Sequence, residues 1–157
     1  MDPVTAHPRP TDVRPRWAIT AIVVWVLLQI SRLIAIPLVG GVLDDRESDA
    51  WLYPAILDIV VAISAPLVAY AIWRKRGLGV WVTAIVFFVV SIVDHADAVT
   101  AGLTATTPRI FGGPADPSIG AAVVPIVQAV IDVVVLGMLT SKKLRAYYLG
   151  PIGSSQR

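Results

Sequence analysis

Long apolar stretches, separated by short polar and basic segments, dominate the chain. Four of them reach about 18 residues or more, the length that crosses a membrane as a helix. They cover roughly residues 17–43, 51–73, 78–103 and 119–140. Aromatic residues such as Trp17, Trp51 and Trp73 fall near their ends, as in the aromatic belts of membrane proteins. The pattern predicts an all-α protein, an integral membrane bundle of four transmembrane helices.

Composition supports this prediction and excludes several kinds of site. The 157 residues are 56% hydrophobic and only 15% charged, against about 25% charged in soluble domains, and the mean hydropathy is +0.74. The chain has no cysteine, which excludes disulfides, thiolate metal sites and cysteine nucleophiles. The few cations flank the membrane, so nucleic acid is not an expected partner. A bias toward Ala, Val and Arg is typical of a GC-rich bacterial genome and suggests a bacterial plasma membrane.

The ends of the chain differ from its apolar middle. Residues 1–16 hold four prolines and no apolar run, and they are predicted to form a disordered cytoplasmic arm. The first apolar run is too long for a cleavable signal peptide and is expected to remain as a span. Residues 17–145 then form the transmembrane domain, and residues 146–157 a short cytoplasmic tail.

Basic residues gather on one predicted side of the membrane. They form three groups: Arg9, Arg14 and Arg16; Arg74, Lys75 and Arg76; and Lys142, Lys143 and Arg145. The two connecting segments on the other side contain only Arg46 and Arg109 as cations. By the positive-inside rule, both termini are predicted to be cytoplasmic.

Arg32 lies inside the first apolar stretch, in the segment WVLLQISRLIAIPLV. At about 1.5 Å per residue it lies about 22 Å from the inner boundary of a ~30 Å core. The same rise places Asp58 and Asp94 at a similar depth, with Asp97 one turn higher. An unpaired charge there costs about 2.5–3.5 kcal/mol, and a guanidinium can bind two carboxylates. We therefore expect an intramembrane charge network of these residues: Arg32, Asp58, Asp94 and Asp97. The alternative is that Arg32 and Asp58 snorkel separately to the outer surface, as Asp97 is expected to do.

A second polar group is predicted nearer the inner surface. Gln128 and Asp132 lie four residues apart on one face of the last span, within reach of Gln29 at the bilayer centre. No cation is expected at the depth of Asp132, so its carboxyl would be protonated in hydrocarbon. Two interpretations stay open. Asp132 contacts a proton or a substrate, or it only joins helices through hydrogen bonds.

His95 completes the set of candidate residues for contact with a proton or substrate, together with Asp132, Gln128 and Gln29. It points about 100° away from Asp94 around the helix, so the two do not form a chelate. The other histidine, His7, lies in the predicted arm. No metal or haem is therefore expected, and His95 is predicted to be an interfacial histidine bonded to a neighbour.

Two classes of function fit these features. The first is a small proton- or solute-linked transport or channel-like protein, with a homo-oligomer as a possible assembly. The second is an accessory subunit whose charges fix packing against a partner in a membrane complex. A membrane enzyme acting on a lipophilic substrate is a weaker third class, because no nucleophile constellation, cofactor motif or metal cluster appears. No catalytic residue and no cofactor are expected, and the lipid bilayer is the predicted environment.

Overall fold

A computed structural model describes residues 15–105, 108 and 119–150, except for the side chains of residues 119 and 121. The helices in chain order are α1 (Arg16–Leu28), η2 (Gln29–Ala35), α2 (Ile36–Leu43), η3 (Asp49–Trp51), α3 (Leu52–Arg74), α4 (Leu78–Thr104), α5 (Ile119–Thr140) and α6 (Lys142–Leu149). The two η segments are 3-10 helices, and no strand occurs in these ranges.

Among the described residues, four helical runs are long and apolar enough to cross a membrane: Arg16–Leu43, Asp49–Arg74, Leu78–Thr104 and Ala122–Thr140. Their outward faces carry exposed large apolar side chains, such as Ile63, Leu67 and Val124, which suit lipid rather than water. The chain is thus an all-α transmembrane bundle of four spans, as the sequence predicts. Of the predicted arm and of the predicted tail, residues 1–14 and 151–157 lie outside the described residues.

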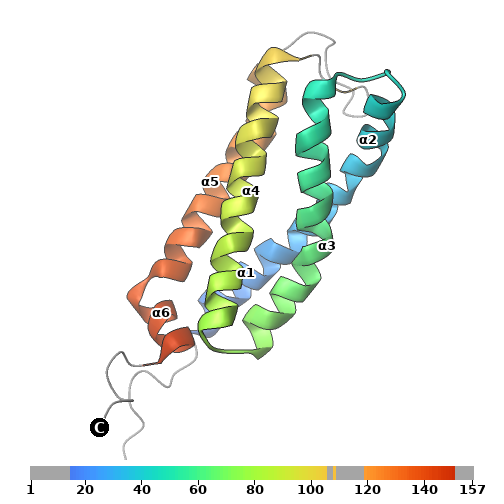
Figure 1. The fold of residues 1–157 in the computed structure, drawn as a ribbon. Coiled ribbons are helices and arrows are strands. Elements are labelled where there is room, and N and C mark those ends of the chain that lie inside the picture. The colour runs from blue at the N-terminus through green and yellow to red at the C-terminus, as the bar shows by residue number, and fades with distance from the viewer. Residues whose placement is uncertain (1–14, 106–107, 109–118, 151–157) are drawn as a thin grey trace, which may run out of the picture.

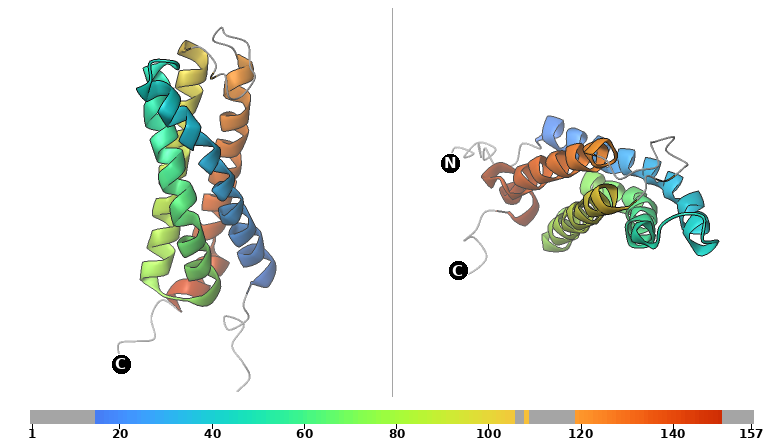
Figure 2. Two further views of the ribbon diagram at one scale, coloured as in Figure 1. Left: turned by 90° about the vertical axis from the view of Figure 1, so that its right-hand side faces the viewer. Right: turned by 90° about the horizontal axis from the view of Figure 1, so that it is seen from above.

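The first span crosses the bundle obliquely, from the lower end behind α4 to the upper end beside α3 (Figures 1 and 2). Helix α4 packs along both α3 and α5, whereas α1 and η2 pack on α3. The start of α1, the turn between α3 and α4, and α6 lie at the same end of the bundle (Figure 1). We call this the basic end, because it carries the basic residues of these segments: Arg16, Arg74, Lys75, Arg76, Lys142, Lys143 and Arg145. The turn between α2 and η3 lies at the opposite end.

A change of helix type in the first span has a cause in the sequence. Pro37 has no N–H and its ring clashes with the carbonyl four residues earlier, that of Leu33. The chain before Pro37 instead forms 3-10 turns, in which Ile36 N–H bonds to the Leu33 carbonyl. Residues three apart align in a 3-10 helix. The buried residues of η2 are accordingly Gln29, Arg32 and Ala35.

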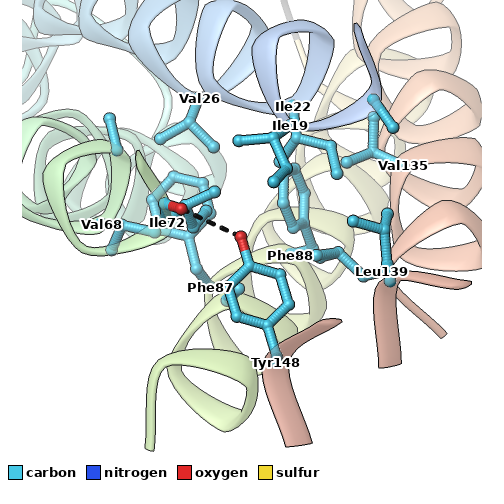
Figure 3. Close-up of a cluster of buried hydrophobic side chains, with 14 of the residues drawn as sticks. Ile19, Ile22, Val26, Val68, Ile72, Phe87, Phe88, Val135, Leu139 and Tyr148 are labelled. Carbon is cyan, nitrogen blue, oxygen red and sulfur yellow. Dashed lines mark hydrogen bonds between the residues drawn. The ribbon is translucent and has the colours of Figure 1, made fainter. Parts of the chain in front are cut away.

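The interior is divided into three layers along the bundle axis. An apolar cluster fills the half toward the basic end and includes Ile22, Phe88 and Leu139 (Figure 3). A smaller apolar cluster toward the opposite end includes Leu38, Trp51 and Ala101. Along α1 to α2 and along α4, the buried polar residues come between the members of these two clusters, and on α3 the half-buried Asp58 does so. A polar layer therefore separates the two apolar ones.

Helix α6 lies where the sequence predicts no helix, across the end of the predicted transmembrane domain (17–145) and the start of the predicted tail (146–157). Ser141 accepts a hydrogen bond from Leu144 N–H and caps the helix. Tyr147 and Tyr148 are buried against the basic end, and Tyr148 Oη donates to the Ile72 carbonyl at 3.0 Å (Figure 3). As far as Leu149, then, the predicted tail is part of a packed helix, because its two tyrosines supply apolar surface that the basic residues before them do not.

Candidate functional site

Seven polar side chains from four helical elements meet in the polar layer, together with the indole of Trp25. We call this set the polar cluster: Trp25, Gln29, Arg32, Asp58, Ser91, Asp94, His95 and Asp132. Six of the eight are buried, and Trp25 is partly buried. The side chain of Asp58 is 29% exposed, far more than that of any other charged member. The cluster is thus mostly enclosed, and Asp58 is its most exposed charged member.

The guanidinium of Arg32 lies at the centre of the polar cluster. Its Nε donates to Gln29 Oε1 at 2.6 Å, which follows from the three-residue spacing of η2. Its Nη1 donates to Asp58 Oδ1 at 3.1 Å and to Asp94 Oδ2 at 2.5 Å. Arg32 therefore binds carboxylates from α3 and α4 at once, the arrangement that the predicted depths favour.

The remaining nitrogen, Arg32 Nη2, faces α4. It donates to Ser91 Oγ at 2.5 Å and lies 2.5 Å from His95 Nε2. A guanidinium has five N–H groups and no acceptor. All five have a partner, so Nε2 of His95 accepts from Arg32 in this arrangement.

Asp132 of α5 has three hydrogen-bond donors around its carboxylate. Trp25 Nε1 donates to Oδ1 at 2.6 Å, and Gln29 Nε2 donates to the same oxygen at 3.4 Å. Ser91 Oγ donates to Oδ2 at 2.6 Å. Side chains of α1 and η2 thus bind α5 directly. Asp132 is fully buried, and both of its oxygens accept hydrogen bonds.

The same carboxylate lies close to both the arginine and the histidine of the cluster. Asp132 Oδ2 lies 3.8 Å from Arg32 Nη2 and 3.3 Å from His95 Nε2. His95 Nε2 thus lies between the guanidinium of Arg32, which can only donate hydrogen bonds, and the carboxylate of Asp132. It accepts from Arg32 when unprotonated and donates to Asp132 when protonated, but it cannot do both. If Nε2 gained a proton, the hydrogen bond from Arg32 would be lost and one to Asp132 would form.

Asp58 and Asp94 are poorer in donors. Each carboxylate receives one bond from Arg32 Nη1. Asp94 Oδ1 is buried and has no hydrogen-bond partner among the described residues. A buried acceptor left without a partner costs about 1–3 kcal/mol. Among the described residues, these two carboxylates are therefore the part of the cluster with the fewest hydrogen-bond donors.

The predicted separation of Asp132 from the Arg32 network is wrong. The prediction counted a constant rise along spans normal to the membrane, whereas the first span is oblique and partly 3-10 helix. In addition, side chains lean toward the N-terminus of their own helix. Arg32 thus leans toward the basic end and Asp132 leans away from it, so that they approach each other.

His95 lies in the polar cluster and not at the interface where the sequence analysis places it. Its ring is buried. Helix α4 packs against α3 on one side and α5 on the other. The turn of about 100° between Asp94 and His95 therefore points them at two different neighbours, Asp94 toward the side of Asp58 and His95 toward Asp132.

Two candidates lie outside the polar cluster. Asp97 is half-buried one turn beyond Asp94, and within the described residues it makes no hydrogen bond or ion pair with Arg32. The five N–H groups of Arg32 are already used, which leaves no donor for it. Gln128 is partly exposed on α5, and no hydrogen bond joins it to Asp132 in the described part of the chain.

Two members of the cluster were not predicted as site residues, although the sequence held a signal for each. Trp25 lies four residues before Gln29 and seven before Arg32, a helical spacing that places all three on one face. It also lies deep in a span and not at an end. Ser91 precedes Asp94 by three residues and His95 by four, which places its hydroxyl between them.

The donor set does not resemble a metal site. The described residues contain no group of three or more His, Cys, Asp or Glu arranged to hold a metal ion. Comparison with known proteins found no matching family, no matching curated protein and no matching solved structure.

Proposed function

We propose that the chain is a small multi-pass plasma-membrane protein that links transport to proton movement, with the polar cluster as its proton-carrying site. One observation carries this proposal. Three aspartates face a single guanidinium between two apolar layers. Excess negative charge is expensive inside a bilayer, and ionisable residues retained there commonly serve ion or proton pathways. The cheapest compensation is a bound proton.

The two apolar clusters cover the polar cluster toward both ends of the bundle, and Asp58 is its most exposed charged member. Asp58 is partly exposed, whereas the apolar cluster containing Ile22, Phe88 and Leu139 fills the bundle toward the basic end. A proton bound at Asp58 therefore reaches the basic end only if helices move. The 3-10 segment η2 is a suitable hinge, since such segments inside long helices often mark one. Alternating exposure of the cluster would couple proton movement to a solute.

A second function is favoured by a different observation. Arg32 has all five N–H groups bonded, and Asp132 has three donors. A network this complete also suits a static role, in which it joins four helical elements of an accessory subunit of a membrane complex. Proton flux separates the two functions, because a static network does not exchange protons across the membrane.

The test uses the full chain in lipid vesicles with a pH gradient and an internal pH-sensitive dye. We expect protein-dependent proton flux, and we expect Asp58→Asn to reduce it about tenfold or more, as loss of a proton-transfer group commonly does. Asp58 has a single described hydrogen bond, to Arg32, so the amide disturbs packing little. Asp97→Asn, outside the cluster, is the matched control and should keep the flux. Parent flux equal to that of protein-free vesicles, or unchanged flux in Asp58→Asn, would favour the accessory subunit.

A further inference from the structure

We propose that Asp58 and Asp94 form a proton-binding pair that shares one proton at neutral pH, with Asp58 as the carboxyl that exchanges it with water. This inference rests on the proposed function and names the atoms that hold its proton. It stands on the unequal distribution of hydrogen-bond donors over the three carboxylates of the polar cluster.

The donors identify Asp132 as the ionised partner of Arg32. Both of its oxygens accept hydrogen bonds, from Trp25, Gln29 and Ser91, and Arg32 Nη2 lies 3.8 Å away. Hydrogen bonds donated to a carboxylate favour its charged form. A proton on Asp132 would compete with donors already in place, so this carboxyl is the least suitable one to hold it.

The pair on α3 and α4 has the opposite character. Its four oxygens share the two N–H groups of one nitrogen, Arg32 Nη1. Because Asp58 Oδ1 and Asp94 Oδ2 bind the same nitrogen, the two carboxylates are close neighbours. Asp94 is only 1% exposed, and its Oδ1 has no partner among the described residues. Two like charges so close together disfavour double ionisation. A single proton between them removes the repulsion and can supply the missing bond.

The surrounding ionisable groups leave the proton with this pair. From η2, Arg32 donates to both carboxylates and cannot release a proton. From α4, His95 Nε2 lies against Arg32 Nη2 and not against the pair. Asp97 of α4 adds a further negative charge one turn away, and Asp132 of α5 is saturated with donors. Among the described residues, no neighbouring group thus replaces the proton as a donor to Asp94 Oδ1.

Exchange with water goes through Asp58. Its side chain is 29% exposed, against 1% for that of Asp94. The proton is taken up on an Asp58 oxygen and is shared with Asp94 without a covalent change elsewhere. The bond broken is an O–H of an incoming hydronium ion, which leaves as water, and the bond formed is the O–H of the pair.

The experiment is infrared difference spectroscopy of the full chain in lipid vesicles, with the aspartates isotope-labelled at the carboxyl carbon. Ordinary aspartates ionise at about pH 4, so at neutral pH the carboxylic-acid C=O band reports an aspartate that has kept its proton. We expect this band in the parent and in Asp97→Asn. We expect Asp58→Asn to remove it, because the amide N–H can donate to Asp94 in place of the proton. Asp58→Glu should keep the band at a shifted frequency, since the acid pair remains.

Two results would overturn the proton-sharing pair. One is absence of the band in the folded parent at neutral pH. The other is a band that persists in Asp58→Asn and disappears in Asp132→Asn, which would place the proton on α5. Asp94→Asn is a second variant that should remove the band if the pair is correct. The band with no proton flux would sustain the pair and reject proton transport, and flux without the band would do the reverse.

Discussion

At the scale of single residues, Arg32 explains how an apolar helix tolerates a charge. An uncompensated charge would be costly at this depth. Arg32 avoids that cost by bonding all five N–H groups within the polar cluster, from Gln29 on its own span to Asp94 and His95 on α4. A lysine has three donors on one nitrogen and could not reach these partners in their separate directions.

The importance of Arg32 can be measured by removing it. Arg32→Leu leaves buried carboxylates without their cation, and we expect a loss of about 3–5 kcal/mol in the free energy of unfolding. Combining it with Asp94→Leu should recover part of this loss, because one of the stranded carboxylates is gone. The measurement is thermal unfolding in detergent.

The matched control is Arg46→Leu. Arg46 forms an ion pair with Asp44 at 2.6 Å, but both side chains are more than half exposed, and such pairs contribute about 0–1 kcal/mol. The double variant Arg32→Leu with Asp94→Leu should lose less free energy of unfolding than the two single variants lose together. An equal loss would mean that these two residues are not energetically coupled.

At the scale of helices, α6 closes the basic end of the bundle. The Tyr148 hydroxyl bonds to the Ile72 carbonyl near the end of α3, and the Tyr148 carbonyl accepts from Gly77 N–H. Gly77 has a φ of 116°, a conformation that favours glycine. The turn between α3 and α4 and the last helix are therefore joined by both backbone and side chain. Arg76 adds a cation–π contact, 4.0 Å above the ring of Tyr147.

Loss of one hydroxyl should loosen this closure. We expect Tyr148→Phe to lower the free energy of unfolding by about 1 kcal/mol, the net value of a typical hydrogen bond, and to leave the Ile72 carbonyl unsatisfied. Trypsin should then cut faster after Lys142, Lys143 and Arg145, as followed by mass spectrometry. Tyr147→Phe keeps the ring beneath Arg76 and serves as the control. Equal cleavage rates in the two variants would show that the hydroxyl does not hold α6.

At the scale of the whole molecule, two asymmetries run along the bundle axis. Basic residues are concentrated at the basic end, while the turn between α2 and η3 holds acidic ones with Arg46. The polar cluster opens at Asp58, near the start of α3, and is sealed toward the basic end by the larger apolar cluster. With the basic end in the cytoplasm, as the positive-inside rule predicts, the proposed proton site would face the outside.

This orientation can be tested by labelling, because the chain has no cysteine of its own. We expect Asp49→Cys, at the opposite end, to react with an impermeant thiol reagent added to intact cells. Lys143→Cys on α6 should react only after the cells are opened. Both positions are exposed, so a difference in labelling reports the side of the membrane. The reverse pattern would invert the orientation and place the opening at Asp58 on the cytoplasmic side.

The four spans and the partners of Arg32 were within reach of the sequence. Span positions follow from the length of each apolar run, since a helix in lipid must satisfy its own backbone and be long enough to cross. The approach of Arg32 to Asp58 and Asp94 follows from the cost of an isolated charge in hydrocarbon. Helix α6 and Trp25 were not predicted from the sequence. A short amphipathic segment suits either water or a packed helix, and a single tryptophan suits either a span end or the interior.

The tertiary structure alone decided that Asp132 and His95 share a site with Arg32, Asp58 and Asp94. Counting along each span gives depth only for straight helices normal to the membrane, and it placed Asp132 apart from Arg32. The oblique first span, its 3-10 segment before Pro37 and the opposed lean of the two side chains bring them to 3.8 Å. Because α4 packs between α3 and α5, His95 likewise faces Arg32 and Asp132 in the interior of the bundle. The sequence by itself determined the number of spans and the need to neutralise Arg32, because both depend on composition and length. That Asp132 and His95 also reach Arg32 depended on helix tilt and rotation, which arise only when the helices pack.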